Sequence, residues 1–159
     1  MFEARQPNGA FVPSFSNVNF SWKVRGKLLN IEFSNGRSYV LKAVMEGVAM
    51  SVRTIIDALR DKGVTVQSVR MSGGGSRNEV WNKIRADIYG VPISLLQTPE
   101  TGCLGAAMFA AVSLGLYSSL REASRMMVRV TRTFRPNPSR VEAYEEMYQR
   151  FKAANSPES

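Results

Sequence analysis

The chain has 159 residues, of which 21 are Lys or Arg and 13 are Asp or Glu, so its formal net charge is +8. This length suits a single domain with one core and excludes large multidomain machinery. No apolar run approaches the about 18 residues that a membrane-spanning helix needs, and the first residues lack the pattern of a secretory signal. We therefore expect a cytoplasmic protein without a membrane partner.

The residue types present exclude several kinds of chemistry. The chain contains no histidine and a single cysteine, Cys103, so a disulfide scaffold, a His-based zinc site and a Ser-His-Asp triad are not available within it. Cys103 lies in an apolar run and is predicted to be a small buried residue rather than a nucleophile. The carboxylates Asp57, Asp61 and Asp87 are scattered and form no predicted catalytic or metal-binding pair.

The basic charge permits binding to a polyanion, but it also suits an acidic neighbouring domain. Because none of the usual nucleic-acid-binding motifs occurs, we do not expect nucleic acid to be the partner. A row of arginines could bind phosphates, although a solvated or domain-facing surface is the commoner meaning of such a row. The row is Arg121, Arg125, Arg129, Arg132 and Arg135.

The first predicted element is a strand over residues 26–33, ended by Ser34-Asn35-Gly36. From Tyr39 the apolar period changes to three and four residues, which predicts a long helix that ends at Lys62-Gly63. Its expected buried stripe is Leu41, Met45, Val48, Val52, Ile55, Ile56 and Leu59.

Strands and helices then alternate, with a strand over 64–71, a helix over 78–89 and a strand over 91–96. Helices follow over 104–112, over 120–127 and at the C-terminal end of the domain, where Val141, Tyr144, Tyr148 and Phe151 repeat at helical spacing. Strands joined through helices predict an α/β fold with a mainly parallel sheet flanked by helices. The small residues of 104–112 predict close packing against that sheet.

Three helix starts carry the Ser-x-x-Glu pattern of a capping box, in which the hydroxyl and the carboxylate each bond a free amide of the first turn. The pairs are Ser76 with Glu79, Ser119 with Glu122, and Ser139 with Glu142.

The sharpest motif is the run Gly73-Gly74-Gly75, which joins a strand to a helix. Backbone without side chains can approach a ligand closely, and the carboxyl end of a parallel strand is where open α/β sheets place ligands. A tight turn is the structural alternative. No lysine follows in the P-loop position, and Asn78 stands where a dinucleotide fingerprint needs its third glycine.

The amide of Asn78 suits a neutral group with donors and acceptors, such as the edge of an adenine, although a solvated first-turn residue is the alternative. The Ser76 and Glu79 box would make a bare phosphate at this helix start less favourable. A second candidate segment covers residues 98–107, where Glu100 precedes several glycines and alanines. Helix packing alone accounts for that composition.

Several blocks of the chain, in order, resemble the C-terminal half of the FGGY carbohydrate kinases, which include glycerol, xylulose and gluconate kinases. The xylulose and gluconate kinases are the most similar group. The blocks are Arg25-Gly26-Lys27-Leu28, Lys42-Ala43-Val44-Met45-Glu46-Gly47-Val48-Ala49, Ser72-Gly73-Gly74-Gly75-Ser76 with Asn78 and Trp81, Ala86-Asp87-Ile88-Tyr89-Gly90-Val91-Pro92-Ile93, Leu104-Gly105-Ala106-Ala107, and Arg132-Thr133-Phe134-Arg135-Pro136-Asn137-Pro138. Two residues depart from the family pattern: Asn30, where glycine is usual, and Tyr39, where a polar helix-start residue is usual.

The resemblance implies the second of two ribonuclease-H-like domains of the actin and Hsp70 type, between which ATP and a sugar bind. It implies that Gly73, Gly74 and Gly75 line the adenosine and α-phosphate of ATP or ADP, and that Asn78 contacts adenine. The family's catalytic aspartate and phosphate loop belong to the first domain and have no counterpart here. We therefore expect no catalytic residue in this chain, no direct Mg²⁺ ligand, and no turnover by the chain alone.

The expected organisation is a leader over 1–10, the kinase C-terminal domain over 11–154 and a frayed tail over 155–159. Because the family's second domain begins before this sequence does, we expect the first strands of its sheet to be absent. The exposed sheet edge would then favour self-association or pairing with the rest of the kinase. The alternative function is a non-catalytic interaction module that keeps the fold and uses a basic face for a partner. The sugar cannot be identified from these residues.

Overall fold

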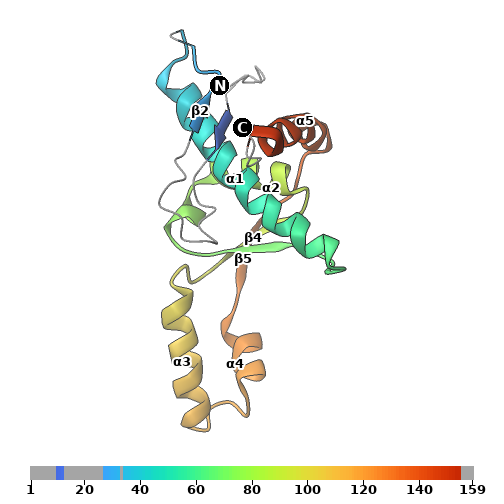
Figure 1. The fold of residues 1–159 in the computed structure, drawn as a ribbon. Coiled ribbons are helices and arrows are strands. Elements are labelled where there is room, and N and C mark those ends of the chain that lie inside the picture. The colour runs from blue at the N-terminus through green and yellow to red at the C-terminus, as the bar shows by residue number, and fades with distance from the viewer. Residues whose placement is uncertain (1–9, 13–26, 33, 155–159) are drawn as a thin grey trace.

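The computed structural model describes residues 10–12, 27–32 and 34–154, so the expected leader, apart from Ala10, and the tail over 155–159 lie outside the described residues. Figure 1 shows the arrangement of the elements. In chain order they are β1 (Ala10–Val12), β2 (Lys27–Leu29), α1 (Arg37–Asp61), β3 (Val69–Met71), the 3₁₀ helix η2 (Gly74–Arg77), α2 (Glu79–Tyr89), β4 (Ile93–Leu96), α3 (Thr101–Ser113), α4 (Leu120–Met127), β5 (Val130–Phe134) and α5 (Pro138–Ala154).

The larger sheet has the strand order β3-β4-β5, and β1 and β2 form a separate antiparallel pair. Strands β3 and β4 are parallel, because the α2 crossover between them returns the chain to the same end of the sheet. Strand β5 runs antiparallel to β4, with Phe134 opposite Ile93. The α/β fold is thus confirmed, but only one of the three strand pairs in the described part of the chain is parallel, which differs from the mainly parallel sheet that we expected.

Strand β5 was not predicted. Four of its five side chains are exposed and only Phe134 is buried, so it lacks an apolar pattern that would mark a strand. It forms because α3 and α4 fold back on each other and return the chain beside β4 (Figure 1). The strand predicted over 64–71 is also shorter, since only Val69–Met71 pairs with β4.

The core lies where α1, α2 and α5 meet the sheet. Its largest fully buried apolar side chains are Tyr148, Phe151, Ile88 and Ile93. Full burial of such a side chain stabilises the fold by about 1.5–3 kcal/mol. The predicted helices are present. The predicted buried stripe of α1 is wrong at four positions that are exposed, namely Leu41, Val52, Ile55 and Leu59.

Helix α1 instead turns a face of smaller and polar residues inward. Its buried residues are Ala43, Glu46, Gly47, Ala49, Met50 and Ile56. Small side chains allow α1 to lie close to α2 and α5, which a stripe of large aliphatic residues would prevent. A second apolar face therefore remains uncovered by the described residues.

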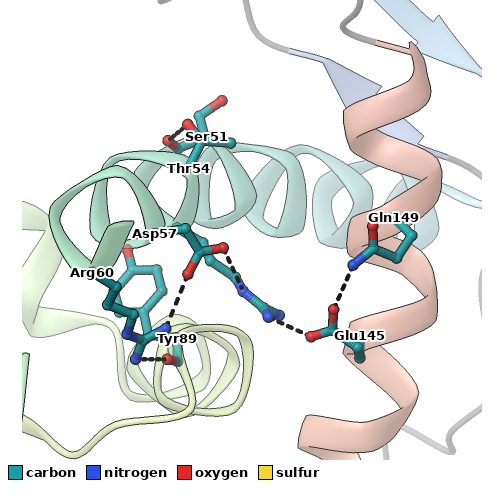
Figure 2. Close-up of polar contacts among 8 residues, drawn as sticks. Ser51, Thr54, Asp57, Arg60, Tyr89, Glu145 and Gln149 are labelled. Carbon is teal, nitrogen blue, oxygen red and sulfur yellow. Dashed lines mark hydrogen bonds and ion pairs between the residues drawn. The ribbon is translucent and has the colours of Figure 1, made fainter. Parts of the chain in front are cut away.

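Polar contacts also join α1 to its neighbours (Figure 2). Arg53 forms ion pairs with Asp57 on its own helix and with Glu145 on α5, and its guanidinium lies 4.1 Å above the ring of Tyr148. At the end of α1, Arg60 donates to the backbone oxygen of Tyr89 over 3.4 Å. These contacts set the position of α1 relative to both helices.

The turn before α1 accommodates both departures from the family pattern. Asn30 has a φ of 53°, in the left-handed region that asparagine tolerates better than most residues, so it serves where glycine is usual. The amide of Glu32 donates to the side chain of Asn35 over 2.8 Å and closes the turn. Tyr39 lies inside the first turn of α1, because the helix already begins at Arg37.

Of the three predicted capping boxes, only the serine half of one is confirmed. Ser119 caps α4 by accepting from the amide of Glu122, whose carboxylate accepts from the amide of Ser118 rather than from that of Ser119. The prediction is wrong at the other two helices. An asparagine takes the cap in each: Asn78 accepts from the amide of Trp81, and Asn137 accepts from the amide of Ser139.

Helices α3 and α4 extend away from the sheet as a pair (Figure 1). The predicted packing of the 104–112 segment on the sheet is wrong in the described residues, because α3 packs along α4 and nothing lies within 4 Å of a side chain added at Gly102 or Gly105. Cys103 is consequently exposed, not buried as predicted. No helix in the described ranges is both long and apolar enough to cross a membrane.

A buried carboxylic group links α1 to α5. Oε1 of Glu46 accepts from the hydroxyl of Tyr144 over 2.6 Å and lies 3.4 Å from Nζ of Lys42. Its other oxygen is buried without a hydrogen-bond partner among the described residues. Burial raises the pKa of Glu46, and this effect outweighs the lowering by Tyr144 and Lys42.

We expect Glu46→Gln to raise the free energy of unfolding at pH 7 by on the order of 1 kcal/mol. Because the pKa of Glu46 is higher in the folded chain than in the unfolded chain, stability falls as the pH rises above about 4.5. Glutamine keeps the acceptor for Tyr144 and does not ionise. Urea unfolding at pH 4.5 and pH 7 measures the effect.

The gain in unfolding free energy should be smaller at pH 4.5 than at pH 7, because the raised pKa of Glu46 favours its uncharged form in the folded chain. Glu142→Gln, at an exposed position of α5, serves as the control and should change stability equally at both pH values. Parallel pH dependence of the native chain and the Glu46 variant would contradict the assignment.

Candidate functional site

Two segments singled out in the sequence meet at one edge of the larger sheet. Because β3 and β4 are parallel, the turn after each strand leaves the sheet at the same end. The amide of Gly73 donates to the backbone oxygen of Pro99 over 2.9 Å, and the hydroxyl of Thr101 contacts that of Ser72 at 3.4 Å. An exposed ion pair between Arg77 and Glu100 spans the same two turns. This is the position at which open α/β sheets bind ligands.

The three glycines of the first turn have three different physical roles. Gly73 has φ 78° and ψ −179°, a conformation that only glycine adopts without strain. A Cβ on Gly75 would lie 3.2 Å from the ring of Trp81 and 3.4 Å from Nη2 of Arg85, so packing against α2 leaves little room for a side chain there. A Cβ on Gly74 would meet no described atom within 4 Å, so among the described residues Gly74 presents open backbone.

Side chains of η2 and α2 hold the glycine turn on the side that faces the protein. Ser76 is buried and donates its hydroxyl to the backbone oxygen of Gly73 over 2.7 Å. Asn82 donates to the oxygen of Ser76 over 2.7 Å, and Arg85 donates to the oxygen of Gly75 over 3.1 Å. These three hydrogen bonds to the oxygens of Gly73, Gly75 and Ser76 fix the backbone of the turn.

Asn78 is the N-cap of α2, and this role occupies half of its amide. Its Oδ1 accepts from the amide of Trp81 over 3.0 Å. Its Nδ2 has no acceptor among the described residues. The side chain is exposed, so one donor group remains available beside the glycine turn.

We predicted that a Ser76 and Glu79 capping box would disfavour a phosphate at this helix start. The prediction is wrong, because that box is not formed. Ser76 bonds Gly73 instead, and the carboxylate of Glu79 forms an ion pair with Arg132 on β5. Negative charge near the helix start is therefore partly neutralised.

The described residues contain no group of three His, Cys, Asp or Glu side chains that could hold a metal ion. Asp87, the most buried aspartate, has a structural role. It accepts from the amide of Asn137 over 2.8 Å and lies 3.6 Å from Arg140, which joins α2 to the start of α5. Burial raises its pKa, and the contacts with Asn137 and Arg140 oppose that rise.

Sequence reasoning missed two residues that hold the turn, Asn82 and Arg85. A signal for them was present, because they lie four and seven positions after Asn78 and so share its face of the helix. Trp81, three positions after Asn78, lies on the same face and donates from Nε1 to the backbone oxygen of Met45 over 3.2 Å, which ties this face to α1.

Comparison with known proteins shows which family this chain is similar to. Residues 3–114 match the model of the FGGY family of carbohydrate kinases, C-terminal domain. The chain is 32% identical to the L-xylulose/3-keto-L-gulonate kinase of Escherichia coli (strain K12) over 141 residues, which are 89% of this chain and 28% of that kinase.

Solved structures show the same fold. The xylulose kinase from Rhodospirillum rubrum matches with a TM-score of 0.80 and 28% identity, over 96% of this chain and 31% of that protein. The Plasmodium falciparum glycerol kinase, solved with ADP, matches in fold with a TM-score of 0.73 and 23% identity, over 92% of this chain and 31% of that protein.

The chain spans less than a third of the length of these proteins. The family match nevertheless covers well over half of its residues, and it includes the glycine turn, α2 and all of α3. This chain therefore belongs to the FGGY family of carbohydrate kinases, and the part of the family that it matches is the C-terminal domain.

Proposed function

We propose that the chain is the nucleotide-binding side of an ATP-dependent sugar kinase and that Gly73, Gly74, Gly75 and Asn78 line its ATP/ADP site. The observation that carries this proposal is the open backbone at Gly74. Arg85 fixes the neighbouring peptide group of Gly75, and the side-chain nitrogen of Asn78 lies beside the turn without an acceptor among the described residues. The glycerol kinase of Plasmodium falciparum, whose structure was solved with ADP, supports the choice of nucleotide.

Each of these residues has a definite part in the proposal. The nucleotide lies against Gly74, where the backbone allows a flat or charged group to approach closely. Nδ2 of Asn78 donates to a ring-nitrogen acceptor of adenine, while Oδ1 continues to cap α2. Gly73 and Gly75 keep the turn in the shape that exposes Gly74.

The reaction of such a kinase moves the γ-phosphoryl group of ATP to a sugar hydroxyl, whose proton passes to a base, and leaves ADP and a sugar phosphate. It needs a positioned base, a metal clamp and a cradle for the γ-phosphate. The described residues supply no candidate metal cluster, and Asp87 is engaged in the fold. By the family resemblance, we assign the base, the Mg²⁺ ligands and the sugar contacts to the other domain of the kinase.

The two kinases that act on xylulose or its relatives support a keto sugar or a related acid as the substrate class of the whole protein. A cytoplasmic location fits a chain whose single cysteine needs no disulfide. The isolated chain is proposed to bind nucleotide without turning it over.

The first test is the binding of ADP to the native chain and to Asn78→Ser, measured by calorimetry at moderate salt. Serine preserves an N-cap oxygen but removes the amide donor, so we expect stability within about 0.5 kcal/mol and an ADP affinity at least several-fold weaker. Asn78→Ala is the companion variant and should also lose about 1 kcal/mol of stability. Equal ADP affinity in the native chain and Asn78→Ser would remove Asn78 from the site.

The second test distinguishes the role of Gly74 in ligand binding from the role of Gly73 in the shape of the turn. Gly74→Ala should leave the thermal stability nearly unchanged, because a methyl group there meets no protein atom, yet it should weaken ADP binding by filling the space the ligand needs. Gly73→Ala should cost about 1–3 kcal/mol of stability, because its backbone conformation is strained for alanine. Thermal unfolding and calorimetry on both variants give the comparison. Undiminished ADP binding by Gly74→Ala would place the nucleotide elsewhere.

The third test is turnover. The purified chain, supplied with ATP, Mg²⁺ and a panel of keto sugars, should release no sugar-dependent ADP in a coupled assay, because the proposal assigns the base and the cradle for the γ-phosphate to another domain. Adding a separately expressed N-terminal kinase domain should restore the activity. Robust sugar-dependent ADP release by the chain alone would disprove the assignment of the base to another part of the protein.

A further inference from the structure

Arg85 is a buried cation directly beneath the glycine turn. Only 7% of its surface is exposed, and its guanidinium lies 3.5 Å above the ring of Trp81. Nη1 donates both to the backbone oxygen of Gly75, over 3.1 Å, and to Oδ1 of Asn82, over 3.2 Å. No carboxylate in the described ranges lies within ion-pair distance of it.

Asn82 extends this contact to the next residue of the turn. Its side chain is fully buried, and it receives one hydrogen bond from Arg85 and donates another to the oxygen of Ser76. The bond from Arg85 orients the amide, because it requires the oxygen of Asn82 to face the guanidinium. Arg85 therefore holds two successive peptide groups of the turn, one directly and one through Asn82.

A buried arginine that has no carboxylate partner destabilises a fold. Burial of a charge costs several kcal/mol unless partners compensate it, and an apolar residue would fill the same space at lower cost. Here the partners are two oxygen dipoles and an aromatic face, which leave the charge incompletely neutralised. That charge lies against Gly75, since a Cβ on Gly75 would be 3.4 Å from Nη2.

We propose that Arg85, acting with Asn82, is a positioning residue that fixes the glycine turn for a nucleotide and favours its phosphates over the bare nucleoside. This inference rests on the proposed nucleotide site. The hydrogen bonds to Gly75 and Ser76 keep the open face of Gly74 in one shape. The buried positive charge attracts an anionic group at the turn through a medium of low dielectric constant.

The test compares Arg85→Met, Arg85→Lys and a matched control, Arg60→Met, in the 159-residue chain. Methionine keeps an apolar side chain over Trp81 and removes both the donors and the charge. Arg60 also donates to a backbone oxygen of α2, but at its opposite end, at Tyr89. Three quantities are measured: the hydrogen exchange of the backbone amides over 73–76, the affinity for ADP and the affinity for adenosine, the last two by calorimetry.

In Arg85→Met we expect exchange of the turn amides at least tenfold faster, ADP binding at least tenfold weaker, and a smaller loss for adenosine. Arg85→Lys should recover part of the ADP affinity, because it keeps the charge but not the planar donor pair. Arg60→Met should change all three quantities by less than twofold. Should Arg85→Met not fold, Arg85→Lys still decides, since it should exchange faster and bind ADP more weakly than the native chain.

ADP binding within twofold of the native value in Arg85→Met would overturn the proposal. Equal losses of ADP and adenosine affinity would overturn the role in phosphate preference. If the native chain binds no ADP, the proposed nucleotide site fails by itself. In that case faster exchange in Arg85→Met still shows that Arg85 fixes the turn, and unchanged exchange overturns this as well.

Discussion

The parallel pairing of β3 with β4 is the constraint on which the rest of the structure depends. A parallel pair requires a crossover, and α2 supplies it. The crossover places the turn after β3 beside the turn after β4, where the amide of Gly73 reaches the oxygen of Pro99. The two segments that the sequence marks for ligand binding therefore become neighbours although about 25 residues separate them.

Helix α2 also joins the site to the core. Its first half carries Trp81, Asn82 and Arg85, which contact the glycine turn and α1. Its second half carries Ile88 and Asp87, of which the first is buried in the core and the second holds the start of α5. One short helix thus bears both the support of the turn and a large part of the packing, so loss of core packing would also disturb the turn.

The buried polar groups are used in different ways. Glu46 and Asp87 each connect two helices, and burial raises the pKa of each. Arg85 contacts no carboxylate among the described residues and points its donors at the glycine turn. Glu46 and Asp87 therefore hold helices together, whereas the donors of Arg85 hold the backbone of the glycine turn.

The sequence by itself determined the α/β class, the helices, the glycine turn and the family, because apolar periods and glycine runs are local and the family blocks are ordered along the chain. Asn78 was singled out for its amide, but its role as the cap of α2 was not, since Ser76 matched the capping pattern equally well. The pairing of β5 and the choice of the buried face of α1 depend on the elements that lie beside them in the folded chain. A local sequence pattern does not contain this information. The roles of Asn82 and Arg85 were decided only by the tertiary structure, because their hydrogen bonds go to backbone oxygens, which every residue possesses, and only the folded turn brings those oxygens within reach.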